Sequence, residues 1–194
     1  MRPALPRGKK RLRYVDGFSL RYLTPDSYDI VMTSDGRTPA LFVPTDEVWI
    51  DRRYRAETDF LLAILRVERQ PRFRGQHYRA IRAALNRLLK KSAPPPFVVR
   101  TERRGGLKIR FVRGETVRQY LDPAFVFGGH DLVYGYIPTE EIWIDVRQDR
   151  REIGFTLMHE LQERAFMARG LTYDEAHDTA IRSELFARAR KFVR

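Results

Sequence analysis

The sequence contains no cysteine among its 194 residues. This absence excludes disulfide scaffolds, thiolate metal sites, cysteine nucleophiles and dithiol redox chemistry. No stretch approaches the roughly 18 apolar residues of a membrane span, and no apolar run of signal-peptide type follows the basic first residues. We therefore expect a soluble, cytoplasmic protein with no membrane partner, and any bound metal must rely on histidine and carboxylate ligands.

Several nucleotide and nucleophile motifs are also missing. The chain has no GxxxxGK phosphate loop, no dinucleotide-binding fingerprint after a strand and no serine-centred nucleophile elbow. Hydrophobic residues nevertheless make up 43% of the chain and charged residues 32%, which is typical of a folded globular protein. The sequence thus predicts a globular fold and disfavours nucleotide-driven chemistry.

The chain has fewer acidic than basic residues, and the difference is larger in its first half. There are 25 acidic residues against 37 basic ones, which gives a net charge of +12. Residues 1–97 contain 20 basic and 10 acidic residues, whereas residues 98–194 contain 17 and 15. This asymmetry predicts a polyanionic partner such as nucleic acid for the first half; the alternative is a solvated, arginine-rich surface.

The chain carries an internal repeat. Val43–Asp51 recurs as Ile137–Asp145 at an offset of 94, and both tryptophans lie in this segment. Shorter matches flank it: Leu20–Pro25 with Val117–Pro123, and Gly75–Tyr78 with Gly170–Tyr173. The proline run at residues 92–96 favours a stiff connector. We therefore predict a basic first repeat over residues 1–91 and a second repeat over residues 97–194.

The fold class that this pattern predicts is α+β, a tandem repeat of two similar modules. Each module should be a small antiparallel sheet followed by a helical hairpin. In the second module we expect strands at 97–101, 107–112, 124–127, 131–136 and 141–145 and helices at 151–169 and 172–193. Gly170 suits the end of the first helix, and Thr172 with Glu175 forms a capping box for the second.

The candidate site lies on these two helices. His159 and Glu163 are four residues apart, and His177 and Glu184 seven apart, so each pair projects from one helix face. Folding the hairpin brings Glu163 near His177 and His159 near Glu184. Buried carboxylates and imidazoles need a partner, which a divalent metal would supply. A satisfied polar network and an exposed face are the alternatives.

The first repeat serves as an internal control. At an offset of 94 or 95, His159 corresponds to Leu65 or Ile64. Glu163 likewise corresponds to Arg69 or Glu68. Because the scaffold does not require the histidines, the site is expected only in the second repeat.

Residues 137–184 resemble a known enzyme family. The run from Glu141 through Phe155–Leu161 resembles the strand-to-active-helix passage of zincin metallopeptidases, especially small gluzincin-like peptidases found beside phage repressors. Those enzymes carry HExxH, whereas residues 159–163 here read HELQE. The chain is also similar to small phage and prokaryotic proteins with an HELxExxxMxxGxxYxxAH pattern, which it matches from His159 to His177.

The resemblance implies a metal-dependent, peptidase-like hydrolase. His159, Glu163 and His177 would bind the ion, and Glu160 would act as general base. Glu184 would be either a fourth ligand or a residue that orients His159. Zn²⁺ is the expected ion, although the additional carboxylate could favour Mn²⁺ or Fe²⁺.

Two further features complete the prediction. His130, after two glycines, could be an additional ligand or electrophile, but a loop histidine is more often at the surface or structural. In the basic half, arginines of the N-terminal arm, including Arg7, and of the helices could neutralise phosphates, with Tyr14, Tyr54, Phe73 and Tyr78 available for base stacking. The alternative function is therefore a non-enzymatic nucleic-acid-binding protein with a structural metal or buried polar site.

Overall fold

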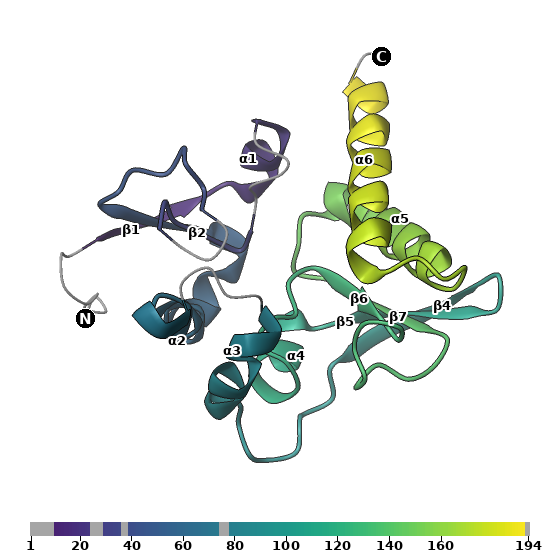
Figure 1. Cartoon of the computed structure of the whole chain (residues 1–194), viewed down its shortest axis with the longest axis horizontal. Coiled ribbons are helices and arrows are strands. Elements are labelled where there is room, and N and C mark those ends of the chain that lie inside the picture. The colour runs from purple at the N-terminus through teal and green to yellow at the C-terminus, as the bar shows by residue number, and fades with distance from the viewer. Residues whose placement is uncertain (1–9, 24–28, 36–38, 74–77, 193–194) are drawn as a thin grey trace. The chain divides into compact units, whose positions relative to one another are not determined.

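The computed structural model describes residues 10–23, 29–35, 39–73 and 78–192. The chain divides into two compact units, unit 1 up to Ser92 and unit 2 from Ala93 (Figure 1). The structure is α+β, with one small sheet in each unit and six α-helices among the described residues. None of these helices is long and apolar enough to cross a membrane. Residues 75–77 of the repeat and Arg7 of the N-terminal arm lie outside the described ranges.

Unit 1 is built around a three-stranded sheet with the order β1-β3-β2. Its elements are β1 (Arg11–Val15), α1 (Gly17–Leu23), β2 (Val31–Met32), β3 (Glu47–Asp51), α2 (Thr58–Glu68) and α3 (Tyr78–Leu85). Short 3-10 turns follow β3, α2 and α3: η2 (Arg52–Glu57), η3 (Pro71–Phe73) and η4 (Asn86–Leu88).

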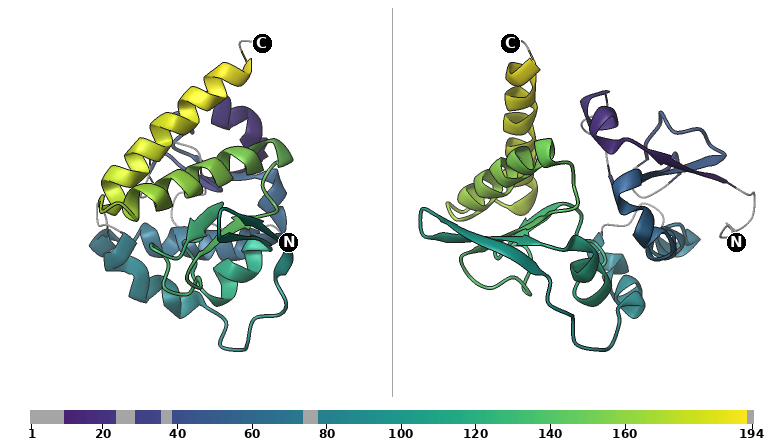
Figure 2. Two further views of the ribbon diagram at one scale, coloured as in Figure 1. Left: turned by 90° about the vertical axis from the view of Figure 1, so that its right-hand side faces the viewer. Right: turned by 180° about the vertical axis from the view of Figure 1, so that it is seen from behind.

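Unit 2 contains a four-stranded sheet with the order β4-β5-β7-β6. Its elements are β4 (Val98–Arg104), β5 (Leu107–Val112), α4 (Gly114–Tyr120), β6 (Gly128–His130), β7 (Glu141–Asp145), α5 (Arg150–Met167) and α6 (Tyr173–Phe192). Helix α5 lies over one face of the sheet, and α6 packs against α5 (Figures 1 and 2).

The prediction of antiparallel sheets is wrong, because both sheets are mixed. Strand β1 runs parallel to β3, and β5 runs parallel to β7. In unit 2, helix α4 and the antiparallel strand β6 intervene between β5 and β7. The chain therefore returns to lie directly beside β5 and in the same direction, whereas a simple succession of hairpins pairs each strand with an antiparallel neighbour.

The predicted strands at 124–127 and 131–136 are also wrong. The strand in this region is β6, and residues 131–136 form turns in which Tyr134 N donates to His130 O (3.0 Å). Tyr134 and Tyr136 pack against the core cluster that contains Trp143. Their aromatic pattern therefore reflects packing of a loop on the sheet and not strand alternation.

Other local predictions are confirmed. The hairpin between β4 and β5 turns through Gly105 and Gly106, both with positive φ (54° and 88°), and α5 is followed by Gly170 at φ 97°. Thr172 and Glu175 form the predicted capping box: Thr172 N donates to Glu175 Oε2 (2.9 Å), and Glu175 N donates to Thr172 Oγ1 (3.4 Å).

Strand β7, in the interior of the unit 2 sheet, is buried on both faces. All five residues of β7 are buried. Ile142 and Ile144 pack with Leu157 of α5, whereas Trp143 points to the opposite face and packs with Val117 of α4. This packing fixes the rotation of α5 about its axis, because Leu157 must face the sheet.

The two sheets have the same pairing register, and each contains an ion-pair cluster of the same kind. Arg13 pairs with Trp49 as Arg110 pairs with Trp143. In each unit the cluster surrounds one glutamate. Glu47 accepts from Trp49 Nε1 (2.6 Å) and contacts Arg11 (3.0 Å) and Arg13 (3.4 Å). Glu141 accepts from Trp143 Nε1 (3.0 Å), Lys108 (3.0 Å) and Arg110 (2.8 Å).

Candidate metal centre

Helix α5 presents the first part of the site. Asp149 caps the helix by accepting a hydrogen bond from Arg151 N (2.9 Å). With Leu157 facing the sheet, the buried side chains of His159, Glu160 and Glu163 lie on another side of the helix. Their burial excludes the alternative of an exposed face.

Three ligand atoms meet between α5 and α6. His159 Nε2 lies 3.3 Å from Glu163 Oε2 and 3.2 Å from His177 Nδ1. His177 Nδ1 lies 2.6 Å from the same carboxylate oxygen. The predicted proximity of Glu163 and His177 is thus confirmed. Two ligand atoms bound at about 2.0–2.1 Å from a tetrahedral zinc ion are about 3.3 Å apart, and two of the three distances agree with that spacing.

Hydrogen bonds cannot satisfy all three contacts among these ligand atoms at the same time. Each imidazole nitrogen needs a proton to hydrogen-bond to Glu163 Oε2, but the contact between the two nitrogens needs a proton on only one of them. At most two of the three contacts can therefore be favourable at once. A cation bound by the lone pairs of all three atoms removes the conflict, so the donor set fits a divalent metal.

The second oxygen of Glu163 is held by His130, which the sequence itself favours less strongly than the other candidate residues. His130, at the end of β6, is fully buried, and its Nε2 lies 3.0 Å from Glu163 Oε1. His130 Nδ1 has no hydrogen-bond partner among the described residues, so a proton on it would be buried and unsatisfied. The proton therefore belongs on Nε2, which donates to Glu163. Of the possibilities left open for His130, the surface position is wrong, whereas a structural role and an approach to the site both agree with its position.

Glu184 approaches His159 from the opposite side of its ring. Glu184 Oε2 lies 3.2 Å from His159 Nδ1, the nitrogen that faces away from Glu163 and His177. Its other oxygen accepts from Arg188 Nε (2.9 Å), and Arg188 also contacts Glu152 (2.8 Å). Of the two roles left open for Glu184, this position matches the residue that orients His159, a common arrangement for metal-ligating histidines.

Glu160 lies beside the ligand triangle. One of its carboxylate oxygens is within 4.8 Å of ligand atoms of His130 and Glu163, and all three side chains are buried. A Cβ placed on Gly128 would lie 2.7 Å from Glu160 Oε1, so the missing side chain of Gly128 makes room for this carboxylate.

The electrostatics of the site shift the pKa values of the two α5 carboxylates in opposite directions. Burial raises the pKa of Glu160 to about 8; the charge of His159 lowers it and that of Glu163 raises it. Burial would also raise the pKa of Glu163, but hydrogen bonds from His130, His159 and His177 outweigh this effect and lower it. Glu163 is thus kept as an anion suited to binding a cation, and Glu160 has the raised pKa of a proton acceptor that works near neutrality.

His159 is strongly basic without a cation. Burial would lower its pKa, but the carboxylates of Glu163, Glu184 and Glu160 raise it to about 10. A metal ion must therefore displace a proton from this ring.

The ligand triangle is open on one side. The side chains of His159 and Glu163 are 11% and 5% exposed, whereas that of His177 is 37% exposed. Tyr173 stacks on the His177 ring, with centroids 5.3 Å apart. The site is therefore exposed to solvent on the His177 side.

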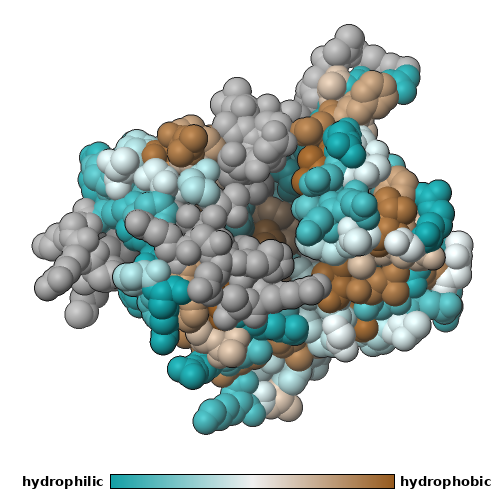
Figure 3. Space-filling view, in the orientation of Figure 1, coloured by the Kyte–Doolittle hydropathy of each residue, from teal (hydrophilic) through white to brown (hydrophobic). Residues whose placement is uncertain are grey.

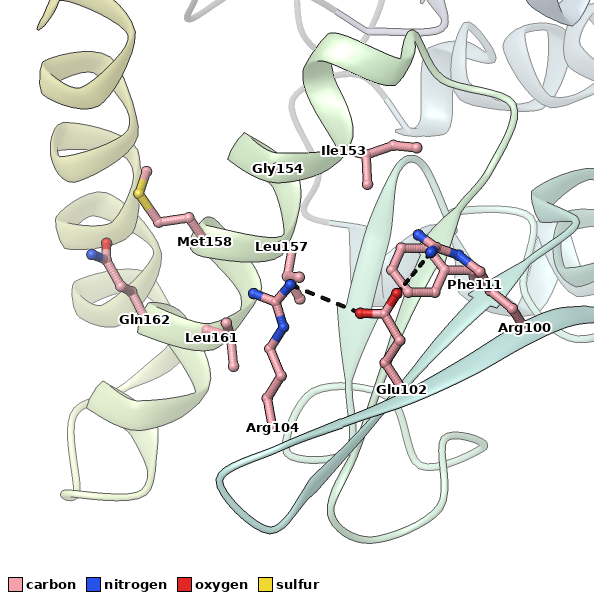
Figure 4. A pocket seen from close by; sticks show the side chains of 10 residues that line it. All are labelled: Arg100, Glu102, Arg104, Phe111, Ile153, Gly154, Leu157, Met158, Leu161 and Gln162. Atoms are coloured by element: carbon pink, nitrogen blue, oxygen red, sulfur yellow. Dashed lines mark ion pairs between the residues drawn. The ribbon is translucent and has the colours of Figure 1, made fainter. Parts of the chain in front are cut away.

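A groove of about 440 Å³ lies on a different side of α5 (Figure 4). It runs between α5 and β4, with Leu157, Met158, Leu161 and Phe111 as apolar lining and Arg100 and Arg104 from β4 opposite them. Glu102 contacts both arginines (2.7 and 3.8 Å). Because His159, Glu163 and His177 do not line it, this groove is not the opening of the candidate centre.

The structure thus brings together His159, Glu160, Glu163, His177 and Glu184, and adds His130 and Arg188. The zincin resemblance and the identity of any ion stay predictions. No protein-family model, curated protein or solved structure matches this chain, so these side chains themselves are the basis for any function.

Proposed function

We propose that this protein is a metal-dependent hydrolase with one divalent ion held by His159, Glu163 and His177. The observation that carries the proposal is the triangle of ligand atoms at 2.6–3.3 Å, which protons cannot fully satisfy. Two imidazoles and one carboxylate are a ligand set known for catalytic zinc, so Zn²⁺ is the expected ion, with Mn²⁺ and Fe²⁺ as alternatives.

The residues around the ligands have separate roles in this proposal. A bound divalent ion would polarise a substrate carbonyl and make a water molecule more acidic. Glu160 takes the proton from the attacking water, because its carboxylate is close to Glu163 and has a raised pKa. His130 holds Glu163, and Glu184 orients His159. The peptidase-like substrate class rests on the resemblance of residues 137–184 to zincins.

We further propose that the chain arose by internal duplication and that only the second copy carries the site. The shared register and the matching Glu47 and Glu141 clusters support a common scaffold. The features around the ligands are specific to unit 2. At the offset of 97 shown by β2 and β6, Val31 occupies the position of Gly128. A valine there leaves no room for a carboxylate like that of Glu160.

Metal binding is tested by titrating purified, chelator-treated protein with Zn²⁺ and measuring bound metal. We expect one equivalent per chain, and loss of this equivalent in His159→Ala. Uptake below about a tenth of an equivalent in the wild-type chain would exclude the proposal. Retention of full stoichiometry and affinity by His159→Ala would contradict the ligand assignment.

The role of Glu160 is tested by comparing variants that retain the ligands. Glu160→Gln should keep zinc and lose turnover of an internally quenched peptide library by at least about 100-fold, the usual scale for a general base. Gly128→Ala should displace Glu160 and also lower turnover with zinc retained. Gly154→Ala, where an added Cβ meets nothing within 4 Å, is the matched control.

The outcomes separate the proposed enzyme from the non-enzymatic alternative. Loss of zinc in Glu160→Gln to the same extent as in His159→Ala would contradict its role as base. A chain that binds zinc but cleaves none of the peptides would support a structural metal site instead.

A further inference from the structure

Besides the basic residues of its N-terminal arm, unit 1 has a second strongly positive segment. Between Glu68 and Glu102 the chain has no acidic residue, and residues 69–92 contain eight basic ones. This segment forms the end of the helical part of unit 1, in which α2, α3 and η4 contact one another. In Figure 3, hydrophilic (teal) and hydrophobic (brown) residues are both visible over the part of unit 1 that contains α2 and α3.

The basic residues in and beside the sheet of unit 1 form ion pairs more often than those of this helical group. Arg11 and Arg13 pair with Glu47, and Arg53 pairs with Asp16 (3.2 Å) and Asp51 (3.2 Å). In the helical group, Arg69 pairs with Asp35, but Arg66, Arg87 and Lys91 are exposed and make no ion pair among the described residues. Arg72, Arg82 and Lys90 are exposed as well. Among the described residues, the helical group therefore presents at least three exposed positive charges that no carboxylate of the chain balances.

From this distribution we infer that the helical group α2–α3–η4 binds the phosphate backbone of double-stranded nucleic acid. The guanidinium fork matches phosphate oxygens, and contacts to the backbone need no recognition motif for particular bases. Cations that neutralise phosphates release counterions from the duplex, so the affinity depends on the salt concentration. This binding is independent of the proposed metal centre, which lies in unit 2.

The aromatic residues of unit 1 argue against recognition of single strands by stacking. Tyr54, one of the predicted stacking residues, is fully buried. Arg55 covers the ring of Tyr14 at 4.8 Å, and Arg72 covers that of Phe73 at 4.6 Å. The side chain of Tyr78 lies outside the described part of the structure. Unit 1 also lacks an apolar anchor for a membrane surface, since Tyr14 and Leu41 are its exposed large hydrophobic residues among those described.

The test is fluorescence anisotropy of a labelled 20-base-pair DNA duplex with the full chain, in EDTA and at 50–200 mM salt. We expect affinity to fall steeply with salt, with a slope of about 0.9 in the double-logarithmic plot for each phosphate contact. The triple variant Arg66→Gln, Arg87→Gln, Lys91→Gln should bind at least about 10-fold more weakly at 50 mM salt. Its slope should be smaller by about 2.7, three times the contribution of one contact.

The control removes the same charge elsewhere. Arg103, Arg113 and Arg150 are exposed in unit 2 and make no ion pair among the described residues, so their replacement by glutamine should change affinity by less than about 3-fold. Absence of binding at 50 mM salt, or equal weakening by both triple variants, would overturn the inference. Equal or tighter binding to polyglutamate or to phosphatidylserine vesicles would also overturn the assignment to nucleic acid.

Discussion

Units 1 and 2 each contain a sheet with the same pairing register, but they differ in the helix that follows the sheet. In both, a buried glutamate two residues before a tryptophan is held by basic residues of the parallel neighbouring strand. They differ on the helix that follows. Helix α2 has Leu61, Leu62 and Leu65 as buried hydrophobic residues, whereas α5 buries His159, Glu160 and Glu163. The comparison shows that the sheet cluster is common to both units, whereas the buried polar cluster of α5 has no counterpart among the buried residues of α2.

The largest expected effect concerns a buried ion pair of the scaffold. Arg118 and Asp145 are 1% and 0% exposed, with Arg118 Nη1 3.1 Å from Asp145 Oδ2. Replacing Arg118 by alanine leaves Asp145 buried without its cation, so we expect the free energy of unfolding to fall by about 3–5 kcal/mol. Urea denaturation measures this loss.

The equivalent change in unit 1 sharpens the comparison. Arg21 corresponds to Arg118 at the offset of 97, so Arg21→Ala should also be destabilising if the scaffolds are equivalent. The exposed Arg113→Ala is the control and should change stability by less than about 0.5 kcal/mol. A loss below about 1 kcal/mol for Arg118→Ala would show that this pair is not part of the scaffold.

The next prediction makes α5 resemble α2. The double variant His159→Leu, Glu163→Leu should weaken zinc binding at least about 100-fold, or about 2.7 kcal/mol, because two of three ligands are lost. In EDTA its free energy of unfolding should be unchanged or higher, because exchanging buried ionic groups for apolar ones of similar size is often neutral or stabilising. Zinc titration and urea denaturation measure the two quantities.

The outcome decides between a functional and a structural cluster. Met158→Leu, on the groove side of α5, is the control and should leave zinc affinity unchanged. If the double variant loses about 3 kcal/mol or more in EDTA, the histidines and glutamates are a structural polar network of unit 2.

The smallest effect is expected at the shared glutamate and depends on pH. Burial alone would raise the pKa of Glu141, but hydrogen bonds from Arg110, Trp143 and Lys108 outweigh it and hold the pKa below 4.5, its ordinary value. The stabilisation is therefore present above pH 4.5 and is lost as the pH falls through the lowered pKa of the folded state. Glu141→Gln should cost about 1–2 kcal/mol at pH 7.

Urea denaturation of wild type and Glu141→Gln at several pH values tests the direction. The difference between them should shrink below pH 4.5. Glu47→Gln, which changes the matching cluster of unit 1, should give a similar loss at pH 7. A difference that grows on acidification would contradict the assigned ionisation of Glu141.

Much of the helical hairpin could be predicted from local patterns. The positions of Gly170, Thr172 and Glu175 mark where one helix ends and the next begins, and helical spacing places His159 beside Glu163. Strand type was harder to predict. The aromatic residues at 131–136 resemble a strand, although they belong to a loop, and the parallel pairing of β5 with β7 depends on the path through α4 and β6.

The sequence by itself determined the periodic features of this protein: the repeat, the helix ends and the pairs of polar residues that share a helix face. Only the tertiary structure decided that His130 holds Glu163 and that Glu184, supported by Arg188, faces the far side of His159. The physical reason is how far apart the contacting residues lie in the sequence. Spacing along a helix follows from its local geometry, whereas the contact of β6 with α5 spans 33 residues and depends on sheet register and core packing.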